Sequence, residues 1–187
     1  MRKLYTFDMI TLDGFFEGIN HDLSWHNVDD EFNIFAIEQL NNTDTLLFGR
    51  VTYELMAGYW PTENAKKNDP VVAAKMNTKA KIVFSKTLQN VDWNNTRLIT
   101  KNIKNEILEI KQQEGKDIAL FGSSALAVNL IDLNLIDEFR IMVNPIFIGE
   151  GKRLFNGLTD NIRMELIKVK IFRSGNVLLY YQPSRIE

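Results

Sequence analysis

The sequence contains "TLLFGRVTYE" at residues 45–54 and "IALFGSSALA" at residues 118–127. Both segments begin with a short apolar run that ends in Phe-Gly and continues into hydroxylated or charged residues. Short apolar runs bounded by turn signals are typical of buried strands, and the residues after each glycine read as the start of a helix. Two such strand-to-helix units predict an α/β domain.

The flanking sequence extends this alternation. Helices are predicted over 29–42, 50–60, 69–78, 103–114 and 123–134, and strands over 80–85, 95–100 and 116–122. The tail changes character, with strands predicted over 136–149, 162–172 and 176–183, joined by turns at "GEGK" and "RSGN". The polar stretch "PTENAKKNDP" at 61–70 is interpreted as a surface loop. These elements predict one domain over 1–187, with a mixed, mostly parallel sheet, helices on both faces and a C-terminal antiparallel hairpin.

Composition excludes several classes of function. The chain has 187 residues, 45% hydrophobic and 25% charged, with a net charge of −2, so nucleic acid is not the expected partner. It has no cysteine, and hence neither a disulfide framework nor a thiolate metal site. No apolar run is long enough for a membrane span, and the N-terminus lacks the pattern of a secretory signal. A cytoplasmic location is therefore expected.

The ends of the strands carry the residues that suit a ligand. In an α/β sheet, ligands bind where strands end and helices begin, because glycine permits close approach and free helix N–H groups attract anions. Together, the two segments suit a pyrophosphate that bridges two helix N-termini, through Gly49, Arg50 and Thr52 in the first and Gly122, Ser123, Ser124 and Ala125 in the second.

A third strand end, "IVFSKTL", places Ser85 and Lys86 at the equivalent edge. A lysine there could meet an additional phosphate and would favour NADPH over NADH. Each feature also has a structural alternative: the glycines can serve only as turns, the serines as helix caps and the lysine as a solvated charge. Neither glycine segment is a GxGxxG or P-loop fingerprint, so the prediction rests on the combination of features.

The combination resembles the dihydrofolate reductase superfamily. "FGRVTYE" resembles its GR-x-T-x-E segment and "FSKTL" its Ser-Arg/Lys segment. "ITLDGFFEG", "FGSSAL" and "LIDEFRIMVNPIFIGEGKRLF" resemble especially the reductase domain of riboflavin biosynthesis and its stand-alone relatives. The resemblance spans roughly residues 2–182.

The resemblance implies a dihydrofolate-reductase-like, three-layer α/β/α fold that binds NADPH, and a homodimer. By position, Arg50 and Thr52 would contact phosphates, Ser85 and Lys86 the adenosine ribose and its 2′-phosphate, and residues 122–125 the pyrophosphate. Where dihydrofolate reductases have Gly-Gly, often with a non-proline cis peptide, this chain has Phe121-Gly122. It also lacks the zinc deaminase domain that many riboflavin enzymes carry.

The substrate side has one candidate. Asp22, in "HDLSW", lies where dihydrofolate reductases carry the acidic residue that anchors the pterin and assists protonation. Alternatively, Asp22 and Ser24 shape a turn over Trp25. Asp13 is interpreted as a turn former, and His21 and His26 as surface histidines, with no metal site expected.

The leading hypothesis is an NADPH-dependent reductase that transfers hydride to a C=N or C=O carbon of a small heterocyclic substrate. The pyrimidine reductase reaction of riboflavin biosynthesis and a dihydrofolate-like reaction are both open. The alternatives are a non-catalytic nucleotide-binding or sensing domain and, third, a structural dimer module.

Overall fold

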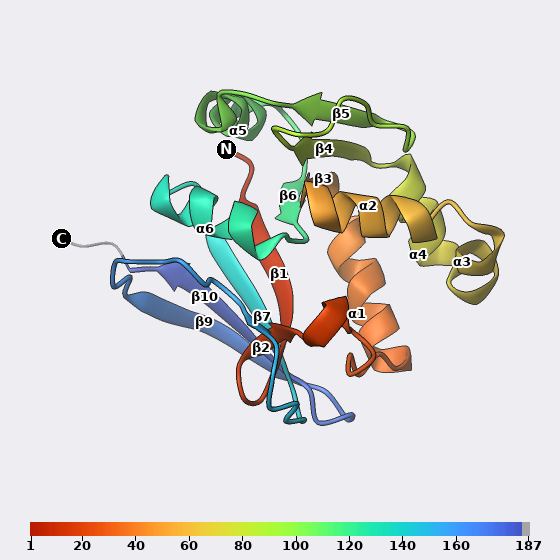
Figure 1. Cartoon of the computed structure of the whole chain (residues 1–187), viewed down its shortest axis with the longest axis vertical. Coiled ribbons are helices and arrows are strands. Elements are labelled where there is room, and N and C mark those ends of the chain that lie inside the picture. Colours follow the sequence, from red (N-terminus) through yellow and green to blue (C-terminus); the bar gives the residue numbers. More distant parts are fainter. Residues whose placement is uncertain (185–187) are drawn as a thin grey trace.

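The computed structural model describes residues 1–184 and is built on an eight-stranded sheet of order β5-β4-β3-β6-β1-β7-β10-β9 (Figure 1). A second sheet pairs two short strands, β2 and β8. The strands are β1 Leu4–Thr11, β2 Phe15–Glu17, β3 Thr43–Gly49, β4 Ala80–Phe84, β5 Thr96–Ile99, β6 Asp117–Leu120, β7 Glu138–Asn144, β8 Lys152–Arg153, β9 Met164–Ile171 and β10 Val177–Pro183.

The large sheet is parallel except at one side. From β5 across to β7 every neighbouring pair is parallel, whereas β10 pairs antiparallel with both β7 and β9. The predicted mixed sheet with a late antiparallel hairpin is thus confirmed. Because parallel strands share one carboxyl edge, β3, β4 and β6 all end on the same side of the sheet.

Within residues 1–184, six α-helices connect the strands, together with a short 3-10 turn at Ile19–His21. The prediction for 29–42 is confirmed by α1, whose N-cap Asp29 accepts a hydrogen bond from the Phe32 N–H at 2.8 Å. Within residues 1–184, none of the helices is long and apolar enough to cross a membrane. The helices are α1 Asp30–Asn41, α2 Arg50–Tyr59, α3 Glu63–Asn68, α4 Pro70–Thr78, α5 Ile103–Gln112 and α6 Ser124–Asp132.

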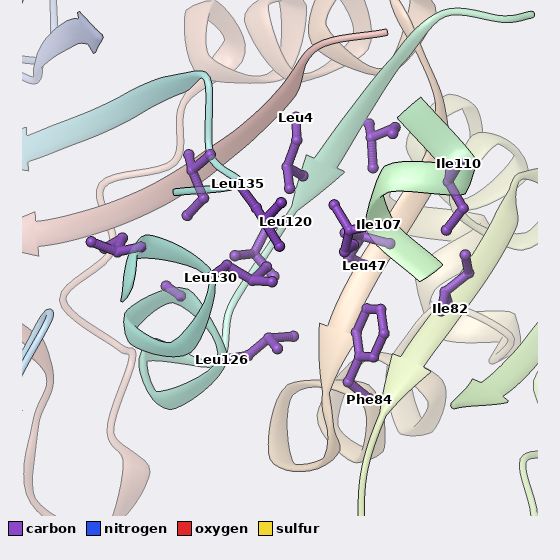
Figure 2. Packing of buried hydrophobic residues seen from close by; sticks show 14 of the residues in the cluster. Leu4, Leu47, Ile82, Phe84, Ile107, Ile110, Leu120, Leu126, Leu130 and Leu135 are labelled. Atoms are coloured by element: carbon purple, nitrogen blue, oxygen red, sulfur yellow. The ribbon is translucent and has the colours of Figure 1, made fainter. Parts of the chain in front are cut away.

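Helices α5 and α6 cover one face of the sheet. Ile107 of α5 and Leu130 of α6 are fully buried against Leu4, Leu47 and Leu120 of the strands. Figure 2 shows these side chains converging between the two helices and the sheet. This face is a continuous hydrophobic layer.

The opposite face packs against α1, α2 and α4. Strand alternation sends Tyr5, Leu46 and Ala119 to this side, next in the chain to residues that face α5 and α6. Its apolar residues form two separate clusters, one around Phe48 and Trp93 and the other around Phe35, Phe172 and Leu178. The predicted three-layer arrangement is confirmed, but its two faces are packed differently.

Three predictions about local structure were wrong. The stretch 61–70, expected to be a loop, contains α3, because the Thr62 hydroxyl caps the Ala65 N–H at 3.2 Å and Ala65 is fully buried. The strand expected over 136–149 ends at Asn144, because Pro145 has no backbone N–H to continue the ladder; Asp13 then accepts the N–H groups of Ile148 and Gly149 in the segment that follows. The "GEGK" segment leads into β8 rather than forming a simple turn.

Candidate functional site

The two Phe-Gly segments meet at the carboxyl edge of the sheet. The Gly49 N–H donates a hydrogen bond to the Gly122 carbonyl at 3.1 Å. A Cβ placed on Gly49 would lie 2.4 Å from Ser123 Oγ and 3.3 Å from the Ser123 nitrogen, so only glycine fits there. The starts of α2 and α6 are therefore held side by side.

At Gly122 the backbone also approaches a neighbouring side chain closely. It has a φ of +90°, and a Cβ there would lie 3.0 Å from Thr52 Oγ1, so Thr52 and the 122–125 segment share one small area. A non-proline cis peptide occurs between Gly122 and Ser123, one bond after the Phe121-Gly122 bond considered from sequence.

The two helix starts offer different donors. Gly49 is the N-cap of α2 and supplies no side-chain cap, so the first N–H groups of α2 face the edge without a side-chain acceptor. Arg50 is half exposed and pairs with Glu54 one turn along the helix at 2.9 Å. On α6, Ser123 Oγ accepts from the Leu126 N–H at 3.4 Å, and Ser124 is buried while Ala125 is exposed.

The third strand end lies beside the first. Gly49 of β3 is in register with Phe84 of β4, which places Ser85 at the same edge. Ser85 Oγ accepts the N–H groups of Thr87 and Leu88 at 3.2 and 3.0 Å, so it forms a turn. Lys86 is exposed. The sequence-predicted cofactor residues thus lie along one continuous edge.

A cavity of about 680 Å³ opens beside this edge, between the sheet and helices α1, α2 and α4. Thr52, Ser123 and Ala125 belong to both the edge and the cavity lining. Most of the remaining wall is apolar, formed by Phe7, Met9, Phe16, Leu23, Val28, Phe32, Ala36, Leu40, Val51, Leu55, Met56, Trp60, Val72, Met76 and Phe121. The arrangement joins an anion-suited edge to an apolar chamber.

Asp8 lines the cavity and was not singled out from the sequence. Strand alternation places its side chain on the same side of β1 as Thr6, whose hydroxyl donates to Asp8 Oδ2. Asp8 is 3% exposed, and its Oδ1 is buried with no hydrogen-bond partner among the described residues. Burial raises the pKa of Asp8 to about 7. An acid in the middle of an apolar strand, "LYTFDMIT", was the available signal.

His26 also lines the cavity, so the prediction that both histidines lie on the surface was wrong for this one. Its Nε2 is buried and has no partner within residues 1–184. Desolvation lowers the pKa of His26 to about 4, against a smaller opposing effect from Asp22. His21 is exposed, and its Nδ1 lies 3.0 Å from Glu17 Oε1.

Asp22 does not line the cavity. Its carboxylate accepts the Ser24 N–H at 3.0 Å, and its backbone carbonyl accepts the Trp25 indole N–H at 3.2 Å. The hydrogen bonds from Ser24 lower the pKa of Asp22, which opposes a role in donating protons. The structure therefore favours the turn-forming alternative. Asp13 likewise anchors a turn, through Thr11, Ile148 and Gly149.

The fold belongs to the dihydrofolate-reductase-like class of reductase folds. It superposes on dihydrofolate reductase from Enterococcus faecalis complexed with NADP(H), with a TM-score of 0.66 and 16% identity over 98% of this chain and 97% of that one. A Shewanella sp. PV-4 protein named for riboflavin biosynthesis gives a TM-score of 0.73 and 22% identity, covering 99% and 100% of the two chains.

The chain belongs to the RibD C-terminal domain family, which matches residues 2–178. Among curated proteins, it is 35% identical to YyaP of Bacillus subtilis (strain 168) over 172 residues, 92% of this chain and 90% of that protein. The bifunctional deaminase/5-amino-6-(5-phosphoribosylamino)uracil reductase of Thermotoga maritima has the same fold, with a TM-score of 0.68 and 15% identity. The match covers 98% of this chain and 57% of that enzyme.

Proposed function

We propose that this protein is an NADPH-dependent reductase of a small heterocyclic or imine-like substrate. The observation that carries the proposal is the junction of two helix N-termini, at Gly49 and Gly122, beside a cavity of about 680 Å³. A dinucleotide needs both features, because its pyrophosphate binds backbone N–H groups and its nicotinamide binds in an apolar pocket. Membership of the RibD C-terminal domain family supports the same assignment.

The residues of the edge fit this cofactor. The uncapped start of α2, Arg50 and Thr52 suit the pyrophosphate, together with the start of α6 at Ser123 to Ala125. Ser85 and the exposed Lys86 suit the adenosine ribose and its 2′-phosphate. When bound, NADPH supplies the hydride. The edge residues would hold the cofactor beside the chamber that would receive the substrate. Since Asp22 is exposed and does not line the cavity, the proposal includes no side-chain proton donor.

Arg50 provides the first test. Arg50→Ala should weaken NADPH binding about tenfold, a loss of about 1.4 kcal/mol, because a charge-assisted contact to phosphate is removed. Arg97→Ala is a matched control: Arg97 is also half exposed and pairs with a glutamate at 2.9 Å, but it does not lie on the edge. Calorimetric titration with NADPH measures both. Equal affinities for wild type and Arg50→Ala would remove Arg50 from the site, and no NADPH binding by wild type would reject the proposal.

A non-catalytic nucleotide-binding or sensing domain is the second candidate. The position of Asp22 favours it, because the one acid predicted to assist catalysis is not part of the cavity lining. The two candidates differ in turnover. NADPH that binds but is not oxidised with any pyrimidine, pterin or imine acceptor would favour the sensing domain, whereas consumption with one of them would favour the reductase.

We also propose that the chain forms a homodimer through β9 at the edge of the sheet. Its apolar side chains are unusually exposed: Leu166 50%, Ile167 48%, Val169 43% and Ile171 73%. An exposed, apolar edge strand is a preferred place for association. Light scattering after size exclusion should show a dimer for wild type and a monomer for Ile171→Glu. A monomeric wild-type protein would reject this assembly.

A further inference from the structure

If the protein is the reductase proposed above, the residues of the cavity wall indicate the chemical class of its substrate. Three aromatic side chains, Phe7, Phe32 and Phe121, form one corner, with ring centroids 6.3 Å apart for Phe7–Phe32 and Phe7–Phe121. Val51 and Leu55 of α2 also line the cavity while remaining 44% and 54% exposed. Apolar surface left open in this way is stabilised when a ligand covers it.

The charges around the cavity are unfavourable for an anion. Among the described residues that line it, Lys152 is the one lysine or arginine, and Glu17, its partner in the β2–β8 pair, lines the cavity too. His21 contacts Glu17, and His26 is held neutral by burial. A phosphate that left water for this chamber would find little positive charge to offset its desolvation.

The helix nearest the chamber presents amides rather than acids. The side chains of α1 that line the cavity are Phe32, Asn33, Ala36, Gln39 and Leu40. Its three acids, Asp30, Glu31 and Glu38, are not part of the lining. Amides can donate to ring nitrogens and carbonyls and can accept from ring N–H groups. The carboxyl groups of the lining, Asp8, Glu17 and Asp69, come from elements other than α1.

We infer that the substrate part of this cavity binds an uncharged, planar aromatic or heteroaromatic ring that carries no phosphate. The ring stacks against the Phe7, Phe32 and Phe121 corner and is covered by Val51 and Leu55. The cofactor's phosphates stay outside, at the junction of α2 and α6. This separates the chain from a phosphoribosyl-pyrimidine reductase such as the Thermotoga maritima enzyme.

The test compares 2-naphthol with 2-naphthyl phosphate, which differ only in the phosphate group. Calorimetric titrations are run with saturating NADP⁺, so that the cofactor's phosphate sites are filled. The naphthol should bind at least about tenfold more tightly, because the phosphate must be desolvated without a cationic partner. Equal or tighter binding of the phosphate would overturn the inference, as would failure of both probes to bind protein that still binds NADP⁺.

The variant Leu55→Lys tests whether the preference for the naphthol over its phosphate arises in the cavity. This variant places a cation on the wall at a half-exposed position and should narrow the ratio between the two probes about tenfold. Leu108→Lys on α5 is the control, because Leu108 is 38% exposed and lies outside the lining. Equal ratios for both variants would place the probes elsewhere and overturn the inference.

The outcomes distinguish this inference from the reductase proposal. If wild-type protein binds neither NADPH nor NADP⁺, the proposed function fails, and the same titrations without cofactor still measure the preference of the cavity. If the cofactor binds and the phosphorylated probe is preferred, only the inference about the substrate fails.

Discussion

The two faces of the sheet are both covered by helices and apolar side chains, but they differ in how completely those side chains fill the space. The α5/α6 face is a continuous hydrophobic layer in which Ile107, Leu120 and Leu130 are fully buried. The α1/α2/α4 face is divided into two clusters with a cavity of about 680 Å³ alongside. One layer supplies stability, while the other gives up part of its packing to leave room for a ligand.

Side-chain shape explains this difference. Branched aliphatic residues from both helices interlock with strand leucines on the α5/α6 face, and such interlocking leaves few voids. On the other face, Phe7, Phe32 and Phe121 meet at tilted or edge-on angles, and Trp60 forms part of the wall. Large rigid rings cannot fill every gap between a sheet and its helices, so the cavity persists.

Shortening one side chain on each face tests whether the two faces are packed differently. Ile107→Ala should lower the free energy of unfolding by about 2–5 kcal/mol, because a fully buried side chain is replaced by a void. Leu55→Ala, at 54% exposure on the cavity wall, should cost less than about 1 kcal/mol. Urea denaturation measures both. Similar losses would show that the two faces are packed alike.

Gly49 and Gly58 lie at opposite ends of α2 and make a matched pair. Gly49→Ala should destabilise the protein by about 1–3 kcal/mol, because the new Cβ would lie within 3.3 Å of the Ser123 side chain and backbone. Gly58→Ala should stabilise it by about 0.5–1 kcal/mol, since nothing lies within 4 Å and alanine favours the helix.

Thermal and urea unfolding measure the two glycine variants. The double variant Gly49→Ala/Ser123→Ala should recover part of the loss, because it removes the hydroxyl that lies nearest the new methyl group. A neutral Gly49→Ala variant would contradict the close contact between the two helix starts.

Asp8 and His26 should give opposite dependences of stability on pH. The pKa of Asp8 is raised to about 7 from 3.8, so its contribution to the free energy of unfolding is full below about pH 4 and falls as the pH rises toward 7. The pKa of His26 is lowered to about 4 from 6.5, so its contribution is full above 6.5 and is lost as the pH falls toward 4. The two effects offset each other in wild type.

Removing either Asp8 or His26 should reveal the effect of the remaining group on the pH dependence of stability. Between about pH 4 and 6.5, the stability of Asp8→Asn should rise with pH by up to about 1.4 kcal/mol per unit, and that of His26→Gln should fall by a similar amount. Urea unfolding at a series of pH values measures both slopes. Slopes of the same sign in the two variants would contradict the assigned burial.

The smallest effect is expected at Lys86, where the edge would distinguish the two cofactors. Lys86→Ala should reduce the preference for NADPH over NADH by a few fold, because an exposed cation contributes about 0.2–1 kcal/mol. Lys67→Ala, an exposed lysine of α3, is the control. Titrations with both cofactors measure the ratio, and an unchanged ratio for Lys86→Ala would remove it from the site.

Local patterns predicted most of the fold and the order of the strand ends. The apolar runs before Gly49 and Gly122, together with their flanking helices, were enough to predict two strands of one mostly parallel sheet that deliver helix N-termini to the same ligand. The prediction was weaker wherever a contact distant in sequence decides the outcome. Pro145 marks the end of β7 locally, whereas the hydrogen bonds that place the segment after it are accepted by Asp13, far earlier in the chain.

The candidate site likewise has one part that local sequence predicts and another that it does not. Glycine, arginine and hydroxyl residues after buried strands are a local signal, so the residues of the proposed cofactor-binding edge could be named from the sequence. The cavity could not be, because Phe7, Phe32, Leu55 and Phe121 come from four separate segments and are brought together by the packing of helices on the sheet. The positions of the strand ends could be predicted because they depend on neighbouring residues. That Asp8 and His26, rather than Asp22, line the chamber could not be predicted, because burial depends on how the sheet and helices pack together.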